Sequence, residues 1–129
     1  MSIISEKTLN DLEFYTILTQ VSEFCISELG KSATLQIKPF ANVDTLNIEL
    51  QRVNEYLSSF ENDNRIPNHY FEDIKKEIHL LKIENSFLEA TSFLKILNNT
   101  NTIYELLLFF KKFKIYYPHL FNLSNSIEY

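Results

Sequence analysis

The sequence contains very little glycine and proline. It has one glycine, Gly30, and three prolines among 129 residues. Tight turns and bulges in β-sheets depend on glycine, so a fold built from many strands is disfavoured. Proline interrupts helices, and its scarcity leaves room for long ones. The shortage of both residues therefore predicts an all-α fold.

Cysteine is equally scarce, because Cys25 is the only one in the chain. A single cysteine excludes an internal disulfide, so we expect a reducing, cytoplasmic location. The thiol could serve as a reactive group or as a small core residue. Its position among apolar residues at helical spacing favours the second interpretation.

Long hydrophobic runs are also missing. The longest uninterrupted apolar run, Leu106–Phe110, is far shorter than the ~20 residues that cross a bilayer. The first residues show no basic segment followed by a long apolar run, as a secretory signal would. We therefore expect a soluble protein with no membrane partner.

The residues that are abundant support a packed but acidic domain. Hydrophobic residues make up 45% of the chain, with 11 phenylalanines and 7 tyrosines, and the net charge is -5. Nucleic-acid affinity depends on neutralising phosphates, so this chain alone is not expected to bind polyanions tightly. A local patch, or another part of a larger protein, would have to supply positive charge.

The stretch Glu13–Pro39 organises the N-terminal part of the chain. Its apolar residues recur at the spacing of one helix face: Phe14, Ile17, Leu18, Val21, Phe24 and Cys25. This pattern predicts a helix over about Glu13–Ile26, after a short helix capped by Ser5. Glycine inside a helix costs about 1 kcal/mol relative to alanine. Gly30 therefore has a packing role at a close helix crossing or a role in a turn, and we favour packing.

The next segment carries the most regular pattern in the sequence. Its apolar residues alternate spacings of three and four: Val43, Leu46, Leu50, Val53, Leu57 and Phe60. Such a heptad face predicts a helix packed nearly parallel or antiparallel to its neighbours. A third amphipathic helix is predicted over Phe71–Leu81.

A long helical stretch is predicted from Phe87 to about Tyr117. Asn98–Asn101 are poor helix formers that either lie within one helix or divide it, and we favour one helix. Pro118 is expected to end this stretch. The sequence thus predicts an all-α core domain over residues 1–121, with about five to six helices in antiparallel, bundle-like packing. Residues 122–129 are predicted to form a tail or a connection to further protein.

No arrangement of residues predicts catalysis. The histidines His69, His79 and His119 lie on different elements, and none has a second ligand at metal-binding spacing. One glycine cannot build a phosphate-binding loop. Cys25 and His79 could act as nucleophile and base, but nothing in the sequence brings them together. We therefore expect no catalytic, cofactor-binding or metal-binding residue, and no enzyme activity in this chain.

One segment could form a binding surface. Phe109–Tyr117 interleaves the lysines Lys111, Lys112 and Lys114 with five aromatic residues. These lysines could contact a phosphate backbone or an acidic face of a protein partner, with the aromatics available for stacking. Alternatively, the aromatics belong to the core and the lysines stabilise the C-terminal end of a helix. We favour the second interpretation and keep the three lysines as candidate contact residues.

The order of several short elements resembles the N-terminus of the MutS-two branch of the MutS family. The matching elements cover nearly the whole chain: Thr8-Leu9, Leu12–Phe14, Ser27–Lys31, Lys38-Pro39, Val53–Glu55, Arg65–Pro67, Phe71–Ile83 and Phe87–Glu89. The order and spacing of these elements carry the resemblance.

The resemblance implies a non-catalytic core module of a DNA-binding ATPase that controls recombination and repair. Proteins of this branch are dimeric and bind branched or duplex DNA. Some act on ribosomes, and many carry a nuclease domain. The resemblance places the nucleotide-binding residues beyond Tyr129, so ATP and magnesium are expected only in the parent protein. The alternative is a stand-alone helical adaptor that binds a protein partner through its aromatic and lysine face.

Overall fold

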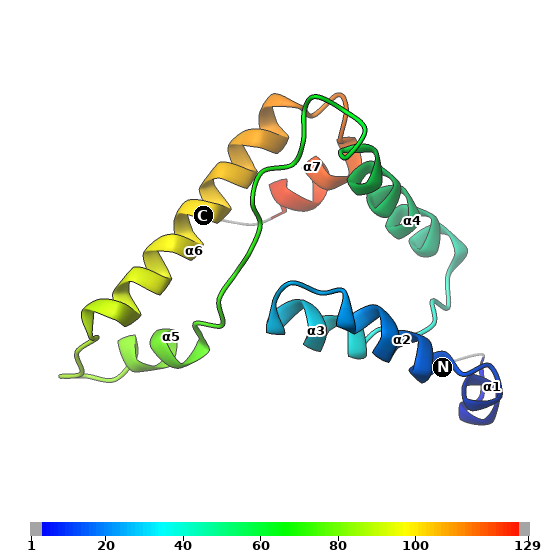
Figure 1. Ribbon diagram of the computed structural model, residues 1–129, viewed down its shortest axis with the longest axis horizontal. Helices are drawn as coiled ribbons and strands as arrows, with labels where there is room; N and C mark the ends of the chain where they lie inside the picture. Colours follow the sequence, from blue (N-terminus) through cyan, green and yellow to red (C-terminus); the bar gives the residue numbers. More distant parts are fainter. Residues whose placement is uncertain (1–3, 127–129) are drawn as a thin grey trace. The chain divides into compact units, whose positions relative to one another are not determined.

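The protein is all-α, as the shortage of glycine and proline predicts. The computed structural model describes residues 4–126, and this range contains seven helices and no strand (Figure 1). Five to six helices were expected. The helices are α1 (Glu6–Asp11), α2 (Phe14–Glu23), α3 (Glu28–Leu35), α4 (Val43–Ser58), α5 (Lys75–Leu81), α6 (Ala90–Lys112) and α7 (Pro118–Asn125). None of the helices in this range is both long and apolar enough to cross a membrane.

The chain forms two compact units, which are described separately. Unit 1 consists of the chain up to Ala41 together with Tyr70–Ile96, and it contains α1–α3, α5 and the start of α6. Unit 2 consists of Asn42–His69 and the chain from Leu97 onward, with α4, the rest of α6 and α7. The boundary predicted between residues 121 and 122 falls inside α7.

The first helix of unit 1 begins where the sequence predicts. The Thr8 amide donates a hydrogen bond to Ser5 Oγ at 3.1 Å, which caps α1. Glu13 then adopts a left-handed backbone conformation (φ 53°), so α2 starts one residue later than predicted, at Phe14. Both α1 and α3 pack against α2.

The second and third helices form a hairpin, seen side by side in Figure 1. The predicted helix to Ile26 ends instead at Glu23, and Ser27 caps a separate helix, α3. Ser27 Oγ accepts a hydrogen bond from the Gly30 amide at 3.1 Å. A good cap within the connection therefore overrides the apolar periodicity that continues past Glu23.

Gly30 has a packing role rather than a turn role. It lies in the first turn of α3, and its φ is not positive. A Cβ at this position would lie 3.3 Å from Ser27 Oγ and 3.5 Å from Cys25 Cβ. Because Gly30 has no side chain, the first turn of α3 can pack closely against Cys25 and Ser27 in the α2–α3 connection. The close approach is to that connection, and not to a crossing helix as expected.

The helices α5 and α6 begin later than predicted. The Asp73 carboxylate accepts a hydrogen bond from the Lys75 amide at 3.0 Å, and α5 starts at Lys75 rather than at Phe71. The long helix α6 covers Ala90–Lys112 instead of Phe87–Tyr117. It runs through Asn98–Asn101 without a break, which confirms the preference for one helix.

The last helix corrects the predicted tail. Asn122–Asn125 are helical, because they belong to α7. Pro118 occupies the start of this helix, where its fixed φ and missing N–H are well tolerated. The sequence pattern predicted only that this proline ends the preceding helix. Residues 127–129 of the predicted tail lie outside the described residues.

A buried carboxylate joins α4 to α7 in unit 2. Glu55 Oε1 accepts a hydrogen bond from the His119 amide at 2.9 Å, and Oε2 accepts one from the Leu120 amide at 2.9 Å. His119 Nδ1 also lies 2.7 Å from Oε1. The N-cap residue of α7, Tyr117, forms no side-chain hydrogen bond that caps this helix. Glu55 therefore satisfies the free amides at the start of α7, and its charge suits a helix N-terminus.

The heptad face of α4 is not covered as the sequence predicts. Five apolar side chains of this face, Val43, Leu46, Leu50, Val53 and Leu57, and Phe60 just beyond the end of α4, are between 36% and 70% exposed. The face that is covered is polar and consists of Arg52, Glu55, Tyr56 and Ser59. The hydrogen bonds of Glu55 to α7, together with that of Tyr56 to His69 at 3.1 Å, explain which face turns inward.

Candidate functional site

The aromatic residues of the Phe109–Tyr117 segment cluster around one buried ring. The Tyr117 side chain is completely buried. Its ring centroid lies 5.6 Å from that of Phe109 and 6.3 Å from that of Phe110. The Phe113 ring completes the cluster, 4.8 Å from Phe109. For Tyr117 the core interpretation of the sequence is confirmed, whereas Phe110 and Phe113 are half-buried.

Two hydrogen-bonded contacts anchor the segment that follows α6. The Tyr117 hydroxyl donates to the carbonyl of Asn64 at 2.6 Å. Glu55 binds the start of α7, directly after Tyr117. Residues 113–116 therefore form a turn that is fixed at both ends, by the end of α6 and by the start of α7.

The three candidate lysines lie around this turn and are exposed. Lys111 and Lys112 are the last two residues of α6, and Lys114 lies in the turn. Lys112 Nζ is 5.0 Å from the centroid of the Phe113 ring, close enough for a cation–π contact. Between residues 4 and 126 no carboxylate forms a salt bridge with any of the three lysines. Their positive charge is therefore available to a partner.

Two apolar side chains stand beside these lysines. Ile115 is 84% exposed and Tyr116 is 61% exposed. Exposed aromatic side chains such as Tyr116 are enriched at protein contact surfaces, whereas lysines belong to the polar rim of such surfaces rather than to their core. We call Lys111, Lys112, Lys114, Ile115 and Tyr116 the lysine turn. Its charge can attract a phosphate backbone or an acidic protein, and its lysines also stabilise the C-terminal end of α6.

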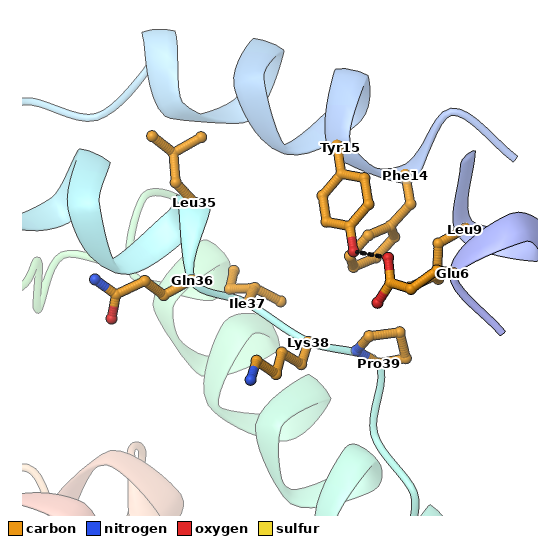
Figure 2. A pocket seen from close by; sticks show the side chains of 9 residues that line it. All are labelled: Glu6, Leu9, Phe14, Tyr15, Leu35, Gln36, Ile37, Lys38 and Pro39. Atoms are coloured by element: carbon orange, nitrogen blue, oxygen red, sulfur yellow. Dashed lines mark hydrogen bonds between the residues drawn. The ribbon is translucent and has the colours of Figure 1, made fainter. Parts of the chain in front are cut away.

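Sequence reasoning missed a cavity of about 600 Å³ in unit 1, drawn in Figure 2. It is lined by Glu6, Leu9, Phe14, Tyr15, Leu35, Gln36, Ile37, Lys38 and Pro39. The neighbouring aromatics Phe14 and Tyr15 and the Lys38-Pro39 stop were visible in the sequence. Nothing there indicated that α1, α2 and the end of α3 would meet around them.

The polar groups of the cavity give it little binding chemistry. The Tyr15 hydroxyl donates to Glu6 Oε2 at 2.8 Å, the dashed contact in Figure 2. This hydrogen bond, with smaller effects of burial and of the Glu6 charge, raises the pKa of Tyr15. The Lys38 side chain points away from Glu6 in the same view. Glu6 and Tyr15 thus satisfy each other, and few polar groups converge on a ligand.

The remaining candidate residues are engaged locally. Cys25 Sγ lies 3.3 Å from the hydroxyl of Thr34 across the α2–α3 hairpin. The ring of His69 contacts the Pro67 carbonyl and the Tyr56 hydroxyl, and His119 contacts Glu55. In the part of the chain that the structure describes, no three His, Cys, Asp or Glu side chains gather as metal ligands would.

Comparison with known proteins identified no relative of this chain. No family model, no curated protein and no solved structure matches this chain. The functional interpretation therefore depends on the residues and the geometry described above.

Proposed function

We propose that this chain is a non-catalytic helical core module of a MutS-two-like DNA-binding ATPase. In this role it supports the lever and clamp of the parent protein and couples nucleotide state to clamp geometry. One observation carries the proposal: Ser27–Lys31, one of the elements that resemble the MutS-two branch, lies in the α2–α3 hairpin, and one face of this hairpin is apolar and uncovered within unit 1.

The two faces of α2 differ in a way that suits a docking element. Leu18 and Ser22 are buried within unit 1. Ile17, Val21 and Phe24 follow each other at spacings of four and three residues and are exposed, Phe24 to 86%. Burying apolar surface contributes roughly 25 cal/mol per Å². A row of three large apolar side chains therefore favours contact with further protein.

Binding of DNA, ATP and magnesium is assigned to the parent protein in this proposal. The chain itself carries a net charge of -5, which opposes contact with a polyanion. Its partners are the remaining segments of the parent, a second parent subunit and, as for some members of the branch, the ribosome. The site of action is the cytoplasm.

The coding sequence downstream of Tyr129 provides a direct test. The proposal expects an open reading frame that continues into long helical heptads and later into a phosphate-binding loop. A native stop codon directly after Tyr129 would contradict it. The discriminating observation requires no purified protein.

A stand-alone adaptor is the second candidate, and the lysine turn favours it. Three lysines that form no salt bridge within residues 4–126, with exposed Ile115 and Tyr116 beside them, fit an acidic protein partner. Gel-shift titration of the isolated chain against duplex and branched DNA tests whether the lysine turn binds DNA. We expect weak or absent binding for the core module. A salt-sensitive, submicromolar affinity that is lost in a Lys111→Ala, Lys112→Ala, Lys114→Ala variant would assign DNA binding to this chain. The matched control is Lys75→Ala, Lys76→Ala, Lys82→Ala, which removes three exposed lysines at α5 and its C-cap.

A further inference from the structure

Glu55 and His119 form a carboxylate–imidazole pair within unit 2, where α4 contacts α7. Glu55 is buried, and its Oε1 lies 2.7 Å from Nδ1 of His119 in the first turn of α7. We propose that Nε2 of His119 accepts a phosphoryl group from a small phosphoramidate or acyl phosphate. The proposed function assigns no covalent chemistry to this chain, so either proposal can fail alone.

The contact with Glu55 fixes which nitrogen of the ring carries the proton. A carboxylate only accepts hydrogen bonds, so Nδ1 is the donor. In the neutral ring the lone pair is then on Nε2. The carboxylate is itself held in place, because Oε1 also accepts the His119 amide and Oε2 accepts the Leu120 amide, both at 2.9 Å. The backbone of α7 and the imidazole are therefore oriented by the same group.

The nitrogen with the lone pair is accessible. The His119 side chain is 38% exposed, whereas that of Glu55 is only 9% exposed. The exposed part of the ring therefore lies on the side away from Glu55, where Nε2 is. Among residues 4–126, no group forms a hydrogen bond with Nε2. A carboxylate that orients an imidazole through Nδ1 and leaves Nε2 free for reaction is the arrangement of a histidine that takes part in group transfer.

The charge of the surrounding segment suits an anionic donor. Residues 106–126 contain three lysines and no acidic residue, although the whole chain has a net charge of -5. The three lysines belong to the lysine turn, which precedes His119 in the same unit. Local positive charge raises the concentration of a phosphate-bearing molecule near the segment that carries it. This chemistry favours a phosphoryl donor over a neutral electrophile.

The transfer can be written as a direct displacement. The Nε2 lone pair attacks the phosphorus of zwitterionic phosphoramidate, an N–P bond to the ring forms, and the bond from phosphorus to the ammonia nitrogen breaks. Ammonia leaves with the hydrogens it already carried. The ring keeps its Nδ1 proton and becomes a phosphoimidazolium, whose positive charge faces the Glu55 carboxylate at the 2.7 Å contact. Glu55 thus acts as a positioning residue that also stabilises the charge formed on the ring.

The other two histidines of the chain provide internal controls. Both ring nitrogens of His69 are engaged, because Nδ1 lies 3.0 Å from the Pro67 carbonyl and Nε2 lies 3.1 Å from the Tyr56 hydroxyl. His79 in α5 is exposed, and within the described part of the chain its ring forms no hydrogen bond. Exposure alone would make His79 the most reactive histidine. The proposal instead places His119 first, His79 second and His69 last.

Phosphorylation of the whole chain by potassium phosphoramidate tests this order. Peptide mass spectrometry at neutral pH follows each histidine separately, and ³¹P NMR identifies the modified nitrogen. We expect His119 to react about tenfold faster than His79, on Nε2. His119→Gln should remove the fast phase, whereas the matched variant His79→Gln should leave it unchanged. A rate at His119 no higher than that at His79, or phosphorylation on Nδ1, would overturn the proposal.

The role of Glu55 is tested by the ring protons of the unmodified chain. NMR of ¹⁵N-labelled histidine should show the proton of the neutral His119 ring on Nδ1, whereas an unconstrained ring such as that of His79 prefers Nε2–H. A proton on Nε2 of His119 would overturn the proposal without any variant. Glu55→Gln, where circular dichroism shows that it folds, should lower the rate at His119 to that of His79. A folded variant that reacts as fast as the original chain would also overturn the proposal.

Discussion

The two units of this protein hold their helices together by different means. In unit 1, α2 and α3 are neighbours in sequence, joined by a short connection in which Ser27 caps the second helix. In unit 2, α4 and α7 lie far apart in sequence, and the Glu55 carboxylate bonds the start of α7. The first contact needs only local closure, whereas the second must offset the entropy of closing a long loop.

The two units differ in how many side chains stabilise the contact between their helices. The hairpin of unit 1 buries a mixture of apolar and small polar residues. Its stabilising contacts are therefore distributed over many side chains. The contact in unit 2 concentrates on one carboxylate that satisfies two backbone amides and a histidine ring. A concentrated polar contact is more sensitive to single substitutions, because each lost partner leaves buried donors unpaired.

Glu55→Gln should produce the largest effect. The amide group offers one acceptor oxygen instead of two, and its NH₂ group faces a backbone N–H of α7. We expect a loss of about 3 kcal/mol in the stability of unit 2, from unpaired buried donors and the lost charge at the helix N-terminus. Urea denaturation followed by circular dichroism measures the effect. The exposed Glu61→Gln is the control, and equal stability of the two variants would show that the carboxylate is not the main contact.

Gly30→Leu tests the corresponding point in unit 1. A side chain here must displace the Ser27 hydroxyl, 3.3 Å from the Cβ position, and Cys25 beyond it. We expect a loss of about 2 kcal/mol from overpacking and from the disturbed cap. Gly30→Ala is the control, since its better helix propensity offsets the close contact. Unchanged melting of the leucine variant would remove the packing role of Gly30.

Part of the fold of both units follows from the sequence. The all-α class, the Ser5 cap and the unbroken path of α6 through Asn98–Asn101 follow from local propensity and periodicity, and they are confirmed. The predicted helix boundaries were wrong where a local polar contact competed with the apolar periodicity. The helix predicted to reach Ile26 ends at Glu23, before the Ser27 cap of α3, and Pro118 begins a helix whose residues Asn122–Asn125 were predicted as a tail.

The burial of α4 could not be predicted by the same reasoning. A heptad pattern indicates which face is apolar, and the usual inference is that this face turns inward. Glu55 instead forms hydrogen bonds with residues more than sixty positions away, and no local signal in the sequence announces such a partner. For the candidate contact surface, the sequence identified Lys111, Lys112 and Lys114 but did not show that Ile115 and Tyr116 would be exposed beside them.

Tyr117→Phe should have a smaller effect on unit 2 than Glu55→Gln. It removes one hydroxyl and leaves the buried ring and its aromatic neighbours in place. The Asn64 carbonyl, which accepts this hydrogen bond at 2.6 Å, loses its partner. We expect a loss of about 1 kcal/mol, measured by thermal melting. Tyr116→Phe, which alters an exposed hydroxyl one residue away, is the control, and a larger loss in the control would contradict the anchoring role of Tyr117.

The smallest effect is expected at Tyr15 in unit 1, and it concerns titration rather than stability. The hydrogen bond to Glu6, followed by burial and by the Glu6 charge, raises the pKa of Tyr15. A raised pKa favours the folded state below the pKa of the unfolded tyrosine, and this contribution is lost as the pH rises through the folded pKa. Glu6→Gln removes the carboxylate and should lower the pKa of Tyr15. NMR of tyrosine labelled at Cζ measures it, with Tyr15→Phe to assign the signal and Glu28→Gln as a charge-matched control. An unchanged Tyr15 pKa in Glu6→Gln would mean that the contact across the cavity in unit 1 does not persist in solution.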